Sequence, residues 1–135
     1  MRLNKSKLIL IAKILFILYL AGVLVLCLCN ISSTPNIPSD IWGIPADKVA
    51  HFMMFLPYPF LLYGAFHGRI NKPYGHIRML LAILISGAVF AGFIELAQSW
   101  TGYRSCEGMD LLADVLGLFT STFILVIASE VYHKW

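Results

Sequence analysis

Residues 8–29 read LILIAKILFILYLAGVLVLCLC, and this stretch decides the fold. Lys13 is its one charged residue. A helix that crosses a bilayer needs about 20 mostly apolar residues, and this run supplies them. A cleaved signal peptide is the alternative, because residues 1–7 are basic. Its apolar region would be too long, however, and no small-x-small cleavage site follows. A lipoprotein signal would need a small residue in place of Leu26. We therefore predict a retained transmembrane helix.

Three further apolar segments predict three more spans, at about residues 47–66, 79–99 and 109–132. Pro57 and Pro59 should kink the second span. Residues 30–46 and 67–78 are polar and rich in turn-forming residues, so we expect a loop and a short link there. Apolar residues make up 59% of the 135 positions and charged residues 13%. This composition argues against a disordered tail, a disulfide-rich secreted scaffold and a nucleic-acid binder. The sequence predicts an all-α integral membrane bundle of four transmembrane helices in one domain, 1–135.

The charges along the chain predict its orientation. With the N-terminus inside, only Lys48 and Arg104 of the 10 basic residues would be external. Of the acids, Glu130 alone would be internal. The positive-inside rule then predicts that both termini lie in the cytoplasm. The expected partner is the lipid bilayer, with no nucleic acid. Small residues such as Gly87 and Ala91 allow close helix packing, more readily within one chain than in a dimer, so the oligomeric state stays open.

Polar residues recur at helical spacing at the outer end of the last three spans. They are Asp47, Lys48 and His51 in the second span, Glu95 and Gln98 in the third, and Asp110 and Asp114 in the fourth, with Arg104 in the loop between the last two spans. The spacings of three or four place the members of each pair on one helix face. Because a carboxylate that faces hydrocarbon costs about 2.5–3.5 kcal/mol, these groups should face one another or water.

Two interpretations of these residues stay open. Asp47 and Asp110 suit the first turn of a helix, where acids favour the dipole, and Glu95 could form a structural ion pair with Lys48 or Arg104. For Asp47 and Asp110 alone, the structural interpretation is the stronger one. For Glu95, Gln98 and Asp114, which lie within the spans, a functional pocket is the stronger prediction. The two interpretations overlap, because a site needs a scaffold.

The chemistry of such a pocket is acid–base or ligand binding. His51, Glu95 and Asp114 are the candidate catalytic residues, with His51 as the acid or base and Lys48 and Arg104 gripping a phosphate or carboxylate. The acids and His51 could also bind a cation, but neither H-E-x-x-H nor D-x-D spacing occurs, so the sequence predicts no metal and no cofactor. A disulfide between Cys29 and Cys106 is conceivable but not demanded.

Three segments resemble the VanZ-like family of small bacterial membrane proteins. They are DKVAHFMMF at 47–55, IELAQ at 94–98 and RSCEGMDLLADVLG at 104–117. Their order and their places at the outer helix ends match the family pattern, which commonly has Asn where this chain has Asp114. The resemblance implies a cell-envelope role and a location in the bacterial cytoplasmic (inner) membrane. The family's named member confers low-level resistance to teicoplanin, a glycopeptide that engages peptidoglycan precursors.

Three functions are then in competition. The first is an envelope protein whose outward-facing pocket binds an anionic cell-wall precursor or lipid-linked ligand, with a link to glycopeptide resistance. The second is a non-enzymatic structural or partner-binding membrane protein. The third, a carrier or channel, is weakest, because no inverted repeat or pair of broken helices is evident in the sequence. The sequence leaves the existence of a catalysed reaction undecided.

Overall fold

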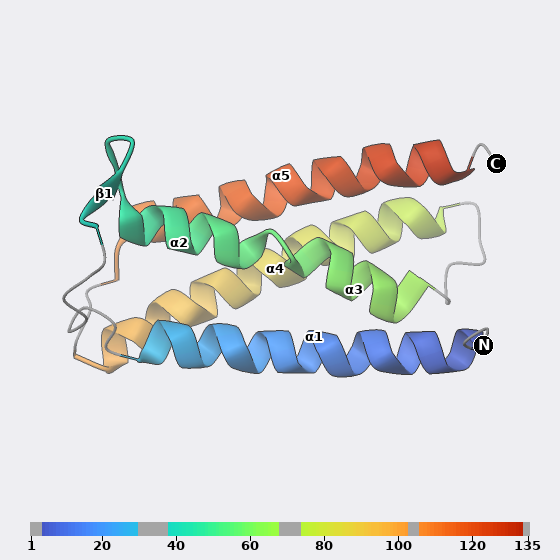
Figure 1. The fold of residues 1–135 in the computed structure, drawn as a ribbon, viewed down its shortest axis with the longest axis horizontal. Coiled ribbons are helices and arrows are strands. Elements are labelled where there is room, and N and C mark those ends of the chain that lie inside the picture. The colour runs from blue at the N-terminus through green and yellow to red at the C-terminus, as the bar shows by residue number, and fades with distance from the viewer. Residues whose placement is uncertain (1–3, 30–37, 68–73, 103–105, 134–135) are drawn as a thin grey trace.

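The computed structural model describes residues 4–29, 38–67, 74–102 and 106–133. In these ranges, the helices form rods that lie side by side, and α1 begins at the same end of the bundle at which α5 finishes (Figure 1). The helices and strands are α1 (Lys5–Leu28), β1 (Asp40–Ile41), β2 (Ile44–Pro45), α2 (Ala46–Phe55), α3 (Tyr58–Phe66), α4 (Gly75–Trp100) and α5 (Gly108–His133).

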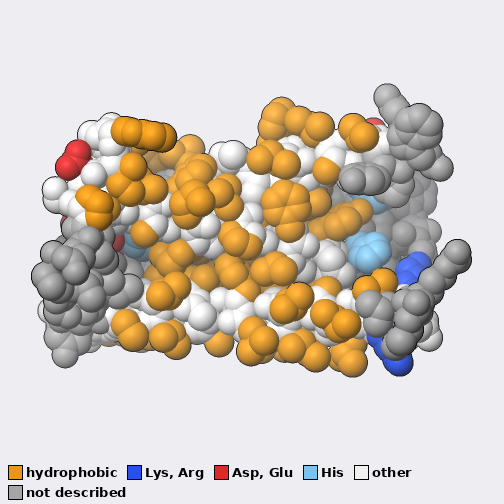
Figure 2. Space-filling model, in the orientation of Figure 1, with side chains coloured by type: hydrophobic (Ala, Val, Ile, Leu, Met, Phe, Trp, Pro, Cys, Tyr) orange, Lys and Arg blue, Asp and Glu red, His pale blue; other side chains and the backbone are white. Residues whose placement is uncertain are grey.

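Within the described residues, four spans are long and apolar enough to cross a membrane, which confirms the predicted helical membrane bundle. They cover Lys5–Leu28, Ala46–Phe66, Gly75–Trp100 and Gly108–Val131. Large apolar side chains such as Ile17, Val89 and Phe123 are 64–68% exposed, whereas several charged side chains are buried. Apolar side chains cover the middle of the face in Figure 2, and charged groups gather at its ends. This inverted pattern is the one expected when lipid is the solvent.

Pro57 and Pro59 break the second span, as the sequence predicted. The span divides into α2, which ends at Phe55, and α3, which begins at Tyr58. Proline lacks the amide hydrogen that continues a helix and its ring clashes with the preceding turn. The Tyr19 hydroxyl of α1 donates a 2.5 Å hydrogen bond to the Met54 carbonyl just before this break. The break therefore contacts the first helix instead of lipid alone.

The connections differ from the predicted ones in two places. α4 begins at Gly75, so Gly75–Arg78 is helical, although we expected it to lie in the link. A small antiparallel hairpin, with Asp40 opposite Pro45 and Ile41 opposite Ile44, precedes α2 in what we expected to be a loop. Its turn places Trp42 at φ 53° and Gly43 at φ 80°, the backbone of a tight two-residue hairpin.

A close approach between α2 and α5 fixes the geometry of one end of the bundle. A Cβ added at Gly117 of α5 would collide with the carbonyl oxygen of Phe52 in α2. Gly87 of α4 similarly faces the Leu118 side chain of α5. Gly87 and Ala91 are both buried, which places this small-residue pair in packing within the chain. We call the end at which α2 and α5 begin and α4 finishes the polar end.

Candidate functional site

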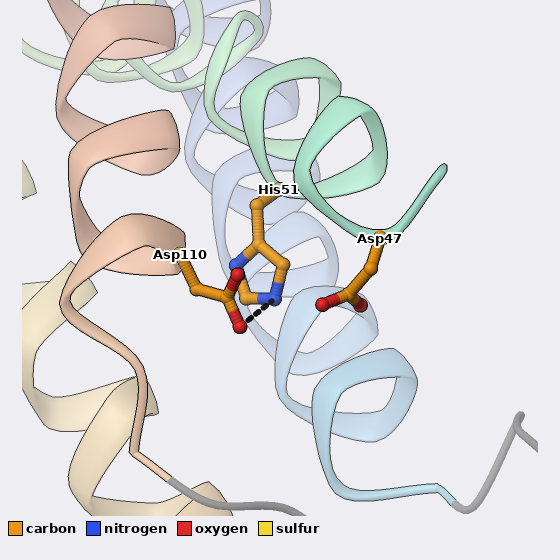
Figure 3. A group of neighbouring side chains, drawn as sticks. All are labelled: Asp47, His51 and Asp110. Atoms are coloured by element: carbon orange, nitrogen blue, oxygen red, sulfur yellow. Dashed lines mark ion pairs between the residues drawn. The ribbon is translucent and has the colours of Figure 1, made fainter. Parts of the chain in front are cut away.

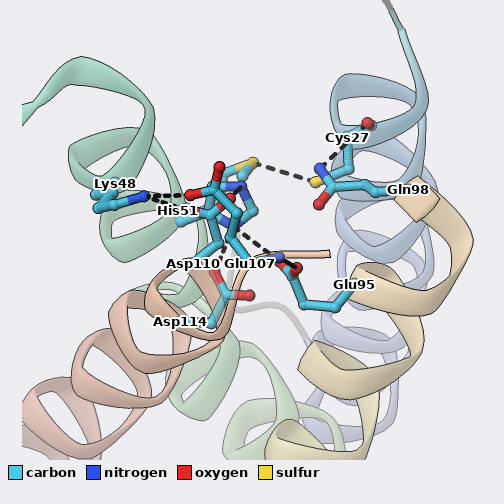
Figure 4. Close-up of polar contacts among 9 residues, drawn as sticks. Cys27, Lys48, His51, Glu95, Gln98, Glu107, Asp110 and Asp114 are labelled. Carbon is cyan, nitrogen blue, oxygen red and sulfur yellow. Dashed lines mark hydrogen bonds and ion pairs between the residues drawn. The ribbon is translucent and has the colours of Figure 1, made fainter. Parts of the chain in front are cut away.

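The polar end brings together charged residues from three helices (Figure 4). Each residue lies within the first two or the last two turns of its helix. These helix ends meet at the polar end, so the side chains lie at a similar depth in the bundle. His51, Glu95, Asp110 and Asp114 are each 2% exposed or less. Lys48 is at the edge of the group, with its side chain 20% exposed. We call Lys48, His51, Glu95, Asp110 and Asp114 the polar cluster.

His51 lies at the centre of the polar cluster. Its Nδ1 is 2.9 Å from Oδ1 of Asp114 and 3.9 Å from Oε1 of Glu95. Its Nε2 is 3.8 Å from Oδ2 of Asp110. Asp47, Asp110 and His51 point toward one another at the start of α2 and α5 (Figure 3). One imidazole therefore faces carboxylates on both of its nitrogens.

Lys48 joins α2 to the start of α5. Its Nζ donates to Oδ1 of Asp110 at 2.8 Å and to Oε2 of Glu107 at 3.0 Å. Lys48 thus pairs with Asp110 and Glu107 and not with Glu95, the partner that the sequence suggested. Glu95 instead accepts the backbone N–H of Glu107 at 3.3 Å. A carboxylate at the start of α5 is stabilised by the positive end of that helix dipole.

Gln98, a predicted ligand-binding residue, contacts the first helix. It is fully buried, and its Nε2 donates to the carbonyl of Cys27 at 3.3 Å, which links α4 to the end of α1. Cys27 also contacts the sulfur of Met54 at 3.9 Å. Cys29 and Cys106 are free thiols, so they form no disulfide in this structure. Arg104, the predicted second external base, lies outside the described residues.

Four buried polar atoms lack a hydrogen-bond partner within the described part of the chain. They are His51 Nε2, Glu95 Oε1, Gln98 Oε1 and Asp114 Oδ2. Because a buried unpaired polar group costs about 1–3 kcal/mol, several of them in one place are typical of a site that holds something further. This concentration is the feature that separates the polar cluster from a fully satisfied structural network.

Residues 8–129 match the VanZ/LLP1 family model. The chain belongs to the VanZ/LLP1 family. The match covers all three segments on which the resemblance was based and nearly all of the four spans. No curated protein and no solved structure matches the chain. The VanZ/LLP1 assignment therefore supports a VanZ-like multi-pass membrane protein, and the chemistry has to be argued from the site.

Glu107 is the residue that the sequence did not single out in this VanZ/LLP1 chain. It had been counted only as an external acid, yet it contacts Lys48 through its side chain and Glu95 through its amide. The one available signal was its place immediately before an acidic helix start. A cavity of about 450 Å³ lies at the opposite end of the bundle, between α3 and α4, where Leu62, Met79 and Arg78 line it. It is mostly apolar and separate from the polar cluster.

Proposed function

We propose that this protein is a cell-envelope membrane protein whose polar cluster binds the anionic headgroup of a cell-wall precursor or a lipid-linked ligand. The observation that carries the proposal is the gathering of buried, incompletely paired polar groups at one end of an otherwise apolar bundle. Intramembrane ionisable groups that face the interior of a bundle commonly mark a functional site. A ligand with an apolar tail and a polar head would match both parts of this surface.

Lys48 is the proposed contact for the anion. An ammonium group has three N–H donors, and two of these are used by Asp110 and Glu107. The third donor has no acceptor among the described residues and lies at a partly exposed edge. Glu107, whose side chain is 53% exposed, could yield its place to a ligand. Arg104 is proposed as a second cation from its sequence position. His51, Glu95 and Asp114 would then set the polarity behind the headgroup or move a proton.

We further propose that this binding takes place outside the cell. The distribution of basic residues supports cytoplasmic termini, with the polar end facing the cell wall. The VanZ-like resemblance makes teicoplanin susceptibility the phenotype in which to look for the effect. We extend the same proposal to the bacterial cytoplasmic membrane as the location.

A binding measurement on the detergent-purified protein tests this function. Farnesyl diphosphate is the probe and farnesol, which has the same tail without the charge, is its control. We expect the diphosphate to bind at least tenfold more tightly than the alcohol, and Lys48→Met to remove the difference. Glu107→Gln frees Lys48 from a competing carboxylate, so it should leave the affinity unchanged or raise it. Equal binding of the two probes would refute the proposal.

A structural role is the second candidate, and the contacts between α2 and α5 favour it. Lys48 with Asp110, and His51 with Asp114, tie these helices together at their ends. On this account, substitutions in the polar cluster lower membrane abundance in proportion to any change in teicoplanin susceptibility. Expression of Glu95→Gln and Lys48→Met at matched abundance distinguishes the two, because a ligand-binding protein still loses its phenotype when its amount is restored.

A further inference from the structure

Negative charge exceeds positive charge in the interior of the polar cluster. Asp110 and Glu107 share Lys48. Among the described residues, His51 is the one basic side chain at ion-pair distance from Glu95 and from Asp114. A neutral imidazole leaves two buried carboxylates uncompensated, and an imidazolium leaves one. Such an imbalance is costly at low dielectric unless a cation or a proton corrects it.

We propose that His51, Glu95 and Asp114 bind a divalent transition-metal cation, Zn²⁺ or Mn²⁺. Each residue offers one ligand atom, and the three atoms lie within 4.8 Å of one another. Metal–ligand bonds of about 2.1 Å in a tetrahedral site separate neighbouring ligand atoms by about 3.4 Å. The distances from His51 Nδ1, 2.9 Å to Asp114 Oδ1 and 3.9 Å to Glu95 Oε1, lie on either side of this value. Small side-chain rotations are therefore enough to form the site.

The unpaired atoms point to the same ligand set. Glu95 Oε1 and Asp114 Oδ2 are buried acceptors without a hydrogen-bond partner among the described residues. A cation at His51 Nδ1 takes the place of the proton that the hydrogen bond with Asp114 requires. One imidazole with two carboxylates suits Zn²⁺ or Mn²⁺ better than Ca²⁺ or Mg²⁺, which prefer oxygen ligands alone. The remaining coordination positions are left for water or a ligand oxygen.

The other face of His51 lies near the Asp110 carboxylate but beyond hydrogen-bonding distance, so a small movement of Asp110 would supply the support that a metal-binding histidine needs. Nε2 lies 3.8 Å from Asp110 Oδ2, and Asp110 is itself held by Lys48 at 2.8 Å. Metal-binding histidines commonly donate their second N–H to a carboxylate, which fixes the tautomer and the ring. Asp47, with His51 and Asp110, forms an alternative set of possible ligands around Nε2. We prefer the set of His51, Glu95 and Asp114. Lys48 already balances the charge of Asp110, whereas no lysine or arginine among the described residues pairs with Glu95 or Asp114.

The metal content of the purified protein tests this inference without any lipid ligand, so its outcome is independent of the proposed headgroup binding. The detergent-solubilised full chain is stripped with a chelator, and Zn²⁺ or Mn²⁺ is titrated back. We expect one equivalent per chain. Glu95→Gln and Asp114→Asn, which preserve shape and remove charge, should weaken binding at least 100-fold. Glu107→Gln is the matched control and should bind within threefold of the wild type.

A second measurement covers the case in which a ligand variant does not fold. Zn²⁺ or Mn²⁺ at 100 times its dissociation constant should raise the melting temperature of the wild-type protein by on the order of 10 °C, and Mg²⁺ at the same concentration should not. The electron paramagnetic resonance spectrum of bound Mn²⁺ should also show coupling to one histidine nitrogen. Absence of stoichiometric binding to the wild type, or unchanged binding in folded Glu95→Gln and Asp114→Asn, overturns the inference in favour of proton sharing.

Discussion

Replacing Gly117 with alanine should disrupt the polar end from a position that carries no charge. The added Cβ would collide with the Phe52 carbonyl oxygen and lie 3.2 and 3.3 Å from the Phe52 carbonyl carbon and Cα. Carbon atoms pack best at about 3.5–4.0 Å. All three obstructing atoms belong to the backbone, so they cannot rotate away, and α2 and α5 must separate by on the order of 1 Å.

The separation can be followed into the site and into stability. Phe52 adjoins His51, so a shift of about 1 Å lengthens the 2.9 Å contact between His51 Nδ1 and Asp114 Oδ1 to about 3.9 Å, beyond hydrogen-bonding range. Overpacking of this kind costs about 1–3 kcal/mol. We therefore expect Gly117→Ala to unfold at a lower denaturant concentration than the wild type in detergent, and to lose affinity for the cation probes.

Gly92→Ala is the matched control for this substitution. Gly92 lies in α4, and an added Cβ there has nothing within 4 Å. Alanine is a better helix former than glycine by about 0.5–1 kcal/mol, so this variant should be as stable as the wild type or more stable. Both unfolding curves can be recorded by circular dichroism under identical conditions. If Gly117→Ala were as stable as Gly92→Ala, the inference that α2 and α5 are too close at Gly117 to accept a side chain would be refuted.

Three further predictions test separate parts of the structure. Lys48→Met should lower the free energy of unfolding by about 1–3 kcal/mol because it leaves a buried carboxylate without its ion pair, whereas Glu107→Gln, at an exposed position, should cost under about 1 kcal/mol in the same unfolding assay. Tyr19→Phe removes the hydrogen bond to the break between α2 and α3 and should cost about 0.5–1.5 kcal/mol, with unchanged helix content by circular dichroism. Cys29 and Cys106 are exposed near the polar end, so a membrane-impermeant maleimide added outside intact cells should label them; labelling only after lysis would reverse the predicted orientation.

The sequence was sufficient for the spans because apolar length is a local property. Each of the four apolar segments, such as residues 8–29, is by itself long enough to cross the hydrocarbon core of a bilayer. Proline at 57 and 59 likewise acts on its own turn, so the break could be predicted. The hairpin at residues 40–45 was missed because a two-residue ladder is too short to show alternation, and its one strong signal was Gly43.

The partners within the site could not be predicted with the same certainty. Helical spacing shows that Asp110 and Asp114 share a face, but the rotation of α5 against α2 depends on the contact of Gly117 with Phe52. Because of that rotation, Lys48 pairs with Asp110, and Glu95 accepts a hydrogen bond from the backbone N–H of Glu107 just before α5. The absence of a metal-binding motif in the sequence has the same origin. The proposed ligands come from three helices, so they have no common spacing along the chain.

The contacts also divide the polar cluster into a part that holds helices and a part that is available for chemistry. Lys48 and Asp110 form a 2.8 Å ion pair between α2 and α5. A substitution that removes one member of such a pair lowers the stability of the protein. Glu95 and Asp114 each keep a buried oxygen without a hydrogen-bond partner among the described residues, so removing one negative charge relieves repulsion as well as removing contacts. A purely structural cluster would lose stability on either kind of substitution. Glu95→Gln and Asp114→Asn should instead preserve or raise the stability of the metal-free protein while they weaken binding, and that opposition between stability and binding marks a functional site.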